Sequence, residues 1–318
     1  MPPKSAAATA LILAILPAAL LSGCSTGSPR IDMAAAERGP TRNGLPMRTV
    51  FQGEDKFQQL SRLAVRENWA ALPLGDRTMR VARELEGIPY GNFTLEISNQ
   101  GEAPSVNFNA LDCWTFYEIA LGFARMVHSR PHPWSPHDLL DMIELERYRG
   151  GVCDGTYLSR MHFLEEVFHD NARRRLGHNP TRSLPGAERL NRQIRDMSSG
   201  WRQYPHLRAN PELVPAIAAM EKRVSRLPVY HIPKQRVAAI EHRIQNGDII
   251  AITSNWHGSY TSHVGLALKQ PDGSVRFMHA TSEQSKGRRV ITDRRISEYL
   301  TERSHRAGII LFRPLELR

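Results

Sequence analysis

The stretch Leu111-Asp112-Cys113-Trp114-Thr115-Phe116 marks the point where a polar loop gives way to an amphipathic helix. Asp112 is suited to cap that helix, so Cys113 is expected in its first turn. Free backbone N–H groups and the helix dipole favour an anion there, which predicts a lowered thiol pKa and a nucleophilic cysteine. A buried structural cysteine is the alternative, since most cysteines on an apolar face are structural. The apolar stripe that defines the helix comprises Phe116, Ile119, Ala120, Phe123 and Val127.

Two histidines lie far downstream, in segments whose composition predicts β-strands. His263 begins the segment Ser262 to Leu268, and His279 lies near the end of the segment Val275 to Ala280. Gln270-Pro271-Asp272-Gly273-Ser274 between them predicts a hairpin turn. The start of the first strand of a hairpin lies beside the end of the second. The two imidazoles are therefore expected at the same edge of one sheet.

Whether the imidazoles share a face depends on the length of the turn. A two-residue Asp272-Gly273 turn would pair His279 with Leu266 and direct His263 to the opposite face. A turn with an odd number of residues, such as Asp272-Gly273-Ser274 with a bulge, would pair His279 with Ala267 and keep both histidines on one face. A catalytic pair requires the odd turn.

The residue types then predict a thiol hydrolase. His263 would accept the proton of Cys113 and later protonate the leaving amine, and His279 would orient His263 through its second ring nitrogen. His257 is a rival for the imidazole roles, but it lies in a glycine-rich loop. No spacing of His, Cys, Asp and Glu matches a zinc signature, so no metal and no other cofactor is expected.

The start of the chain predicts export. Lys4 precedes an apolar stretch from Ala6 to Leu21, which ends in Leu21-Ser22-Gly23-Cys24. This sequence resembles the lipobox of bacterial lipoproteins, in which the chain is cut before a cysteine that then carries the lipid. An ordinary secretory signal is the alternative. The stretch is too short and interrupted for a membrane span. By that resemblance, residues 1–23 are the signal peptide and Cys24 is the lipidated residue. Ser25 follows the cysteine, and the resemblance to Gram-negative lipoproteins then implies the periplasmic face of the outer membrane.

Composition limits the class of protein and its partners. The chain has 318 residues, 41% of them hydrophobic and 23% charged, which are ordinary globular values. Residues 24–58 are rich in Gly, Pro, Ser, Arg and Asn and predict a tether, followed by a catalytic domain over residues 59–318. The net charge of +10 suggests an acidic partner. For an exported lipoprotein, peptidoglycan peptides fit better than nucleic acid, and a monomer is expected.

The two cysteines left after lipidation of Cys24 present an alternative to thiol chemistry. Cys113 and Cys153 would meet an oxidising compartment, where a disulfide between them would block the nucleophile. A single pair is weak evidence for a disulfide framework in a domain of this size.

Several short motifs together resemble the NlpC/P60 superfamily of cell-wall hydrolases, and within it the DUF1460 group of N-acetylmuramoyl-L-alanine amidase-like proteins. The resemblance extends from about Leu60 to Pro314. The motifs are Gly87-Ile88-Pro89-Tyr90, Thr94-Leu95-Glu96, Leu111-Asp112-Cys113, Gly247-Asp248-Ile249-Ile250, Ser262-His263-Val264-Gly265, His279-Ala280-Thr281, Tyr299-Leu300, and Gly308-Ile309 before Arg313-Pro314.

The resemblance implies a papain-like α+β fold, with a cysteine-bearing helix packed on an antiparallel sheet that bears the histidines. It assigns Cys113 as nucleophile, His263 as base and His279 as the third residue. Residues from about 129 to 245 are then a helical insertion beside the site. Trp114 departs from the smaller residues usual in the group, and Tyr90 is expected to border the oxyanion region. The substrate-binding residues that we predict are Tyr90, Asp112, Trp114, Trp256 and Ser262.

The expected activity is hydrolysis of the amide bond between N-acetylmuramic acid and L-alanine in peptidoglycan fragments. The nearest alternative is an endopeptidase that cuts the stem peptide next to γ-D-glutamate. A muropeptide-binding lipoprotein without catalysis and an acyl transferase acting on lipid are further alternatives.

Overall fold

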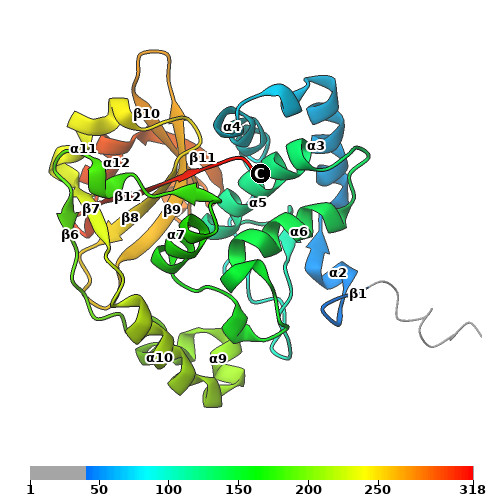
Figure 1. The fold of residues 1–318 in the computed structure, drawn as a ribbon, viewed down its shortest axis with the longest axis horizontal. Helices are drawn as coiled ribbons and strands as arrows, with labels where there is room; N and C mark the ends of the chain where they lie inside the picture. Colours follow the sequence, from blue (N-terminus) through cyan, green and yellow to red (C-terminus); the bar gives the residue numbers. More distant parts are fainter. Residues whose placement is uncertain (1–40, 318) are drawn as a thin grey trace, which may run out of the picture. The chain divides into compact units, whose positions relative to one another are not determined.

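A computed structural model describes residues 41–317, and its centre is one antiparallel sheet with the strand order β11-β10-β9-β8-β12-β7-β6 (Figure 1). A short strand, β5, pairs with the end of β12. This arrangement confirms the expected α+β class with an antiparallel sheet. The strands are β5 (Gly177–His178), β6 (Glu188–Arg189), β7 (Tyr230–Pro233), β8 (Ile249–Ser254), β9 (Thr261–Lys269), β10 (Val275–Ala280), β11 (Val290–Arg295) and β12 (Arg306–Pro314).

The β9–β10 hairpin has the parity that a histidine pair requires. Lys269 pairs with Val275 and Leu266 with Met278, so five residues from Gln270 to Ser274 form the turn. The expected three-residue turn, with His279 opposite Ala267, is therefore wrong in length, since Phe277 takes that place. An odd number of turn residues is nevertheless present, and it keeps His263 and His279 on the same face.

Apolar side chains alternate between the two faces of the sheet. Ile249 and Ala251 of β8 join the larger core, which contains α5 (Cys113–Ser129), whereas Ile250 and Ile252 join a second core. Helices α11 (Lys234–Ile240) and α12 (Ile296–Thr301) cover that second face. Burial on both faces explains why β8 is a continuous apolar run.

Helix α5 lies between the sheet and α4 (Leu74–Glu84) and α6 (Pro136–Arg147), as Figure 1 shows. Instead of burying only one stripe, it is buried on all sides from Thr115 to Val127. Two polar residues on its other faces are paired with α6: Glu118 with Arg147 at 2.8 Å and Arg125 with Glu146 at 2.8 Å. These ion pairs make an all-round buried helix possible despite its charges.

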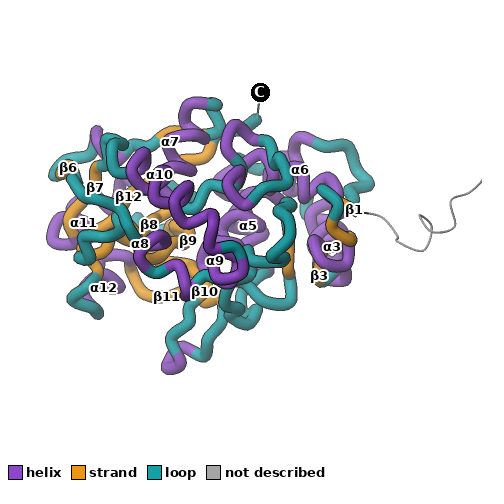
Figure 2. The backbone as a smooth tube through the Cα atoms, turned by 90° about the horizontal axis from the view of Figure 1, so that it is seen from below, coloured by secondary structure: helices purple, strands orange, loops and turns teal. Residues whose placement is uncertain are grey.

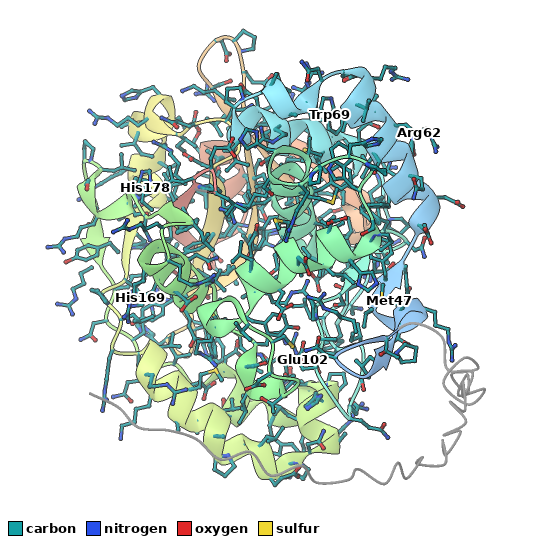
Figure 3. All side chains as sticks on the ribbon, turned by 45° about the vertical axis from the view of Figure 1, so that its right-hand side comes forward. Met47, Arg62, Trp69, Glu102, His169 and His178 are labelled. Atoms are coloured by element: carbon teal, nitrogen blue, oxygen red, sulfur yellow. The ribbon has the colours of Figure 1, made fainter. Side chains whose placement is uncertain are left out.

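Residues 41–58 belong to the folded unit, so this part of the expected tether is wrong. They contain β1 (Thr41–Arg42), β2 (Leu45–Pro46), α2 (Met47–Val50) and β3 (Phe51–Gln52), which pairs with β4 (Val106–Asn107). The chain then enters α3 (Glu54–Arg66). Val50 and Phe57 are fully buried. Val50 docks on the core from a segment that lacks periodicity, whereas Phe57 begins the buried face of α3. Figure 3 shows Arg62 of α3 pointing outward.

The expected helical insertion, residues 129–245, also contributes strands. Its helices are α6, α7 (Leu164–Arg173), α8 (Asp196–Ser199), α9 (Pro205–Ala209), α10 (Val214–Val224) and α11. Helix α10 packs against α8, and Figure 2 shows the two together. However, β5, β6 and β7 lie in the same segment and extend the sheet beyond β12, so the segment is not purely helical.

The predicted signal peptide and Cys24 lie outside the described residues. Within residues 41–317, none of the helices has the length and apolarity needed to cross a bilayer.

Candidate active site

The N-terminus of α5 is fixed by a capping box. The Asp112 carboxylate accepts the N–H of Thr115 at 2.8 Å, and the Thr115 hydroxyl accepts the N–H of Asp112 at 3.0 Å. Thr94 donates its hydroxyl to the second carboxylate oxygen of Asp112 at 2.6 Å. This arrangement confirms the predicted helix start, and it holds Cys113 at the first helical position.

The two hairpin histidines are directly hydrogen-bonded. Nε2 of His263 lies 2.7 Å from Nδ1 of His279. His279 is completely buried, whereas His263 is partly exposed at the start of β9. The close approach depends on Gly265, because a Cβ there would lie only 2.8 Å from Cβ of His279 and 2.5 Å from the carbonyl oxygen of Met278.

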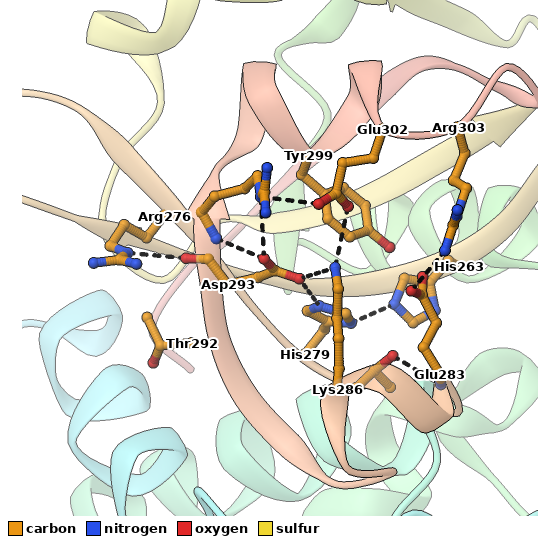
Figure 4. A network of polar contacts seen from close by, with 12 residues as sticks. His263, Arg276, His279, Glu283, Lys286, Thr292, Asp293, Tyr299, Glu302 and Arg303 are labelled. Carbon is orange, nitrogen blue, oxygen red and sulfur yellow. Dashed lines mark hydrogen bonds and ion pairs between the residues drawn. The ribbon is translucent and has the colours of Figure 1, made fainter.

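A carboxylate that the sequence analysis missed lies behind this pair. Oδ2 of Asp293, on β11, lies 3.3 Å from Nε2 of His279 and accepts a hydrogen bond from Lys286 at 2.5 Å (Figure 4). Tyr299 of α12 packs edge-on against His279, with ring centroids 5.2 Å apart. No spacing in the sequence indicates these partners, because the pairing of β10 with β11 and the position of α12 bring them together.

Cys113 and His263 line one cavity of about 460 Å³. Four of the predicted substrate-binding residues also line it: Tyr90, Asp112, Trp114 and Ser262. Trp256 does not line it, and its role in substrate binding stays a prediction. It lies about half exposed in the loop before β9, and Ser259 and Thr261 from the same region line the cavity instead.

The indole ring of Trp114 is fixed by a hydrogen bond within α5. Its indole Nε1–H donates to Glu118 at 2.7 Å, one turn further along α5. The ring is therefore held against the cavity wall by the buried Glu118–Arg147 pair.

The prediction of a lowered thiol pKa is wrong. Enclosure by protein and, secondarily, the charge of Asp112 raise the pKa of Cys113 to about 12, although the backbone amides of Val264, Cys113 and Trp114 act in the opposite sense. Loss of solvation by water therefore outweighs the helix terminus. The pKa of His263 is lowered by burial and by its neighbours His279, Arg306 and Lys286. Both groups are therefore neutral near pH 7.

The positive charge of the chain does not extend to the cavity. Its lining contains three carboxylates, Glu96, Asp112 and Asp196, and one guanidinium, Arg160. Arg160 is buried and contacts Glu96 at 3.0 Å and Glu102 at 3.4 Å. The basic residues that make the chain positive thus lie elsewhere, and an acidic group entering the cavity would not meet an unpaired cation among these residues.

Both described cysteines are free. Sγ of Cys153 donates to the carbonyl oxygen of Glu102 at 3.4 Å, so the alternative of a Cys113–Cys153 disulfide is not realised in this structure. Among residues 41–317, no group of three or more His, Cys, Asp or Glu side chains is placed to hold a metal ion.

Comparison with known proteins identifies the family. The family model described as AmiA-like, N-acetylmuramoyl-L-alanine amidase-like, matches residues 80–309. This chain belongs to that family. The match confirms the resemblance to the amidase-like DUF1460 group and indicates a hydrolase with a peptidoglycan-related substrate.

Solved structures agree with this family assignment. An N-acetylmuramoyl-L-alanine amidase from Bacteroides uniformis is 28% identical, with a TM-score of 0.68, and the match covers 76% of this chain and 99% of the amidase. A Bacteroides fragilis protein provisionally described as a xylanase is 30% identical, with a TM-score of 0.64 and coverage of 74% and 99%.

A DUF1460 protein from Legionella pneumophila shares the fold at 19% identity and a TM-score of 0.62, with coverage of 82% and 95%. Among curated proteins, none matches this amidase-like chain.

Proposed function

We propose that this amidase-like protein is a cysteine hydrolase that cleaves the N-acetylmuramoyl-L-alanine amide bond of peptidoglycan fragments. Cys113 acts as nucleophile, His263 as base and His279 as the orienting third residue, in a papain-like arrangement. The observation that supports this most is that the cavity is lined by both Cys113 and His263, while His279 is bonded to His263 at 2.7 Å.

Because the thiol of Cys113 and the imidazole of His263 are both neutral, the electrostatics favour transfer of the thiol proton during the attack. A thiolate–imidazolium pair formed beforehand is less favoured. Nε2 of His263 is engaged with His279, so Nδ1 is the nitrogen that serves as base. As the sulfur of Cys113 bonds to the carbonyl carbon, its proton moves to His263. His263 then gives that proton to the amine while the C–N bond breaks, which leaves a thioester. Water hydrolyses the thioester with the same base and restores the thiol.

Two groups are suited to stabilise the negative oxygen that forms during attack. The backbone N–H of Cys113 lies at a helix N-terminus. Burial is the main reason why the pKa of the Tyr90 hydroxyl is raised, and the charge of Asp112 acts in the same sense, so this hydroxyl keeps its proton and remains a donor.

A glycosidase mechanism, which the description of the Bacteroides fragilis protein suggests, has less support. It requires one carboxyl group to give a proton and a second to act on the sugar. Of the three lining carboxylates, Glu96 is paired with Arg160 and also accepts the Tyr157 hydroxyl, and Asp112 caps α5. Only Asp196 remains, whereas the mechanism requires two carboxyl groups.

The location of the enzyme is part of this proposal. Cleavage before Cys24 and lipidation of that residue would anchor the domain at the periplasmic face of the outer membrane. Labelling of the expressed chain with radioactive palmitate tests this: the label is expected in the natural chain and absent after Cys24→Ala. Equal labelling of both chains would exclude Cys24 as the lipidated residue.

The decisive experiment is digestion of purified muropeptides followed by mass spectrometry of the products. An amidase releases a free stem peptide that begins with L-alanine and a sugar that ends in lactate. An endopeptidase leaves L-alanine on the sugar. Cys113→Ala is expected to abolish hydrolysis and retain muropeptide binding, and Cys153→Ala is the matched control with near-normal activity. Unchanged hydrolysis in Cys113→Ala would exclude the thiol mechanism.

A further inference from the structure

We propose that Asp293 is a positioning residue that fixes the tautomers of both histidines, so that Nδ1 of His263, the nitrogen that His279 does not engage, is left unprotonated. This inference rests on the proposed role of His263 as base. It adds a fourth member, from β11, to the three residues that the sequence indicates.

The first step concerns the donors around Asp293. This carboxylate is buried and accepts three hydrogen bonds: from Nε2 of His279 at 3.3 Å, Nζ of Lys286 at 2.5 Å and the N–H of Arg294 at 2.8 Å. The Arg294 guanidinium lies further away, at 3.8 Å. Burial alone would raise the pKa of Asp293, but the hydrogen bonds from His279 and Lys286 lower it below the ordinary value. Asp293 is therefore ionised and can only accept hydrogen bonds.

The second step assigns the protons from this fixed acceptor. Because Asp293 cannot donate, Nε2 of His279 must carry the hydrogen, which leaves Nδ1 of His279 as an acceptor. The hydrogen between the two rings then belongs to Nε2 of His263. In a neutral imidazole only one nitrogen is protonated, so Nδ1 of His263 has a free lone pair. That is the form a general base requires.

The third step is that the surroundings offer His279 no substitute for Asp293. Among the described residues, its only hydrogen-bond partners are His263 and Asp293. Its other neighbours are aromatic: Phe277 is stacked at 4.6 Å and Tyr299 lies edge-on at 5.2 Å. If the carboxylate were absent, either tautomer would leave a buried ring nitrogen unpaired, and the ring orientation would be less defined.

Lys286 keeps the carboxylate in place. It bridges Asp293 and Glu302, at 2.5 and 3.1 Å (Figure 4). Arg306 binds the same Glu302 oxygen at 3.0 Å. The guanidinium of Arg306 lies over the Tyr299 ring at 3.6 Å. This network connects β11, the loop before it, the end of α12 and the start of β12, so the orientation of His279 depends on several separate segments of the chain.

Two substitutions separate the hydrogen bond from the charge. Asp293→Ala removes both. Asp293→Asn is expected to keep an oxygen toward Lys286 and His279 but removes the charge, while Lys286 and Arg306, the other charges that act on the histidines, stay in place. Glu298→Ala, an exposed carboxylate of α12 whose side chain makes no hydrogen bond within the described residues, is the matched control.

The direct measurement is the ¹⁵N chemical shifts of labelled histidines, which report the protonated nitrogen of each ring. The natural protein, Asp293→Asn and Glu298→Ala should show protonated Nε2 and bare Nδ1 at His263 and His279. Asp293→Ala should show a mixture of tautomers. A natural tautomer in Asp293→Ala would overturn the proposal.

The second measurement is kinetic. Asp293→Ala is expected to reduce kcat for muropeptide hydrolysis by about 10- to 100-fold with little change in KM, like other carboxylates that orient a functional histidine. The loss of kcat in Asp293→Asn should be smaller. The acid limb of the pH profile of Asp293→Asn should move to lower pH, because the negative charge that raises the histidine pKa values is gone. A fall in kcat without any change in tautomer or pH profile would indicate a merely structural role and overturn the proposal.

Failure of the proposed function is distinguishable from failure of this inference. The tautomers, and the pH dependence of Cys113 alkylation followed on its peptide by mass spectrometry, require no muropeptide. If the natural protein hydrolyses nothing but Asp293→Ala alters the tautomers, the positioning role stands and the assigned reaction is wrong.

Discussion

The two sides of the reactive centre, the first turn of α5 and the outer edge of the β9–β10–β11 sheet, are held by different kinds of contact. Cys113 is placed by residues close to it in sequence, because Asp112 and Thr115 form the cap at its helix start. His263 is placed by a hairpin turn, and His279 behind it contacts Asp293 on another strand.

This difference shows which properties of a residue are determined by its short sequence motif. The position of Cys113 follows from local capping, whereas its pKa does not: enclosure and the charge of Asp112 decide it. The protonation of His263 likewise depends on charges from β11, β12 and the loop between β10 and β11. Geometry on the helix side is local, and electrostatics on both sides is a property of the whole fold.

The largest expected effect concerns the reactivity of the thiol. With a pKa of about 12 instead of 9.0, Cys113 carries about 1000-fold less thiolate at pH 7 than an ordinary cysteine. Its thiolate forms only as pH rises toward 12, so alkylation by iodoacetamide in the free protein should be slow at pH 7 and increase steadily to pH 10. A plateau that already begins near pH 5 would reveal a preformed thiolate–imidazolium pair and contradict this view.

The second effect tests the support beneath the helix side. Arg147→Met leaves Glu118 buried without its partner, which is expected to reduce the free energy of unfolding by about 3–5 kcal/mol. Urea unfolding measures the loss. Arg236→Met, which breaks an exposed pair with Glu188, is the control and should cost at most about 1 kcal/mol. Equal losses of unfolding free energy in the two variants would mean that the buried ion pair stabilises the protein no more than the exposed one.

The third effect tests the histidine side. In Gly265→Ala the new Cβ would meet the carbonyl of Met278 at 2.5 Å and Cβ of His279 at 2.8 Å. The overpacking is expected to cost about 1–3 kcal/mol of stability and to reduce kcat by displacing His279. Gly101→Ala is the control, because its Cβ would have no neighbour closer than 3.8 Å. Natural activity in Gly265→Ala would show that the histidine contact tolerates displacement.

The smallest effect concerns the cap itself. Asp112→Ala removes the acceptor for Thr115 and is expected to lower stability by about 1 kcal/mol in thermal unfolding. Asp112→Asn keeps an acceptor oxygen and should cost less. Both should lower the pKa of Cys113, because the charge that helps to raise it is removed. An unchanged alkylation profile in both variants would assign the raised pKa to enclosure alone.

Much of the fold was predictable from short-range patterns. The helix start at Cys113 and the α+β class follow from capping and hydrophobic patterns, which depend on neighbouring residues. The common face of His263 and His279 depended on the parity of the turn, which its sequence left open. Residues 41–53 were misassigned because a few apolar side chains dock there without any period, and residues 54–58 because they are only the beginning of the amphipathic helix α3.

The sequence by itself determined that a cysteine begins a helix and that two histidines lie at the same edge of a hairpin. Only the tertiary structure decided that Asp293 lies behind His279, that Trp256 stays out of the cavity and that the thiol is neutral at rest. The physical reason is that local conformation depends on residues a few positions apart. Ionisation and cavity shape depend on solvation and charge, which distant segments supply when the chain folds.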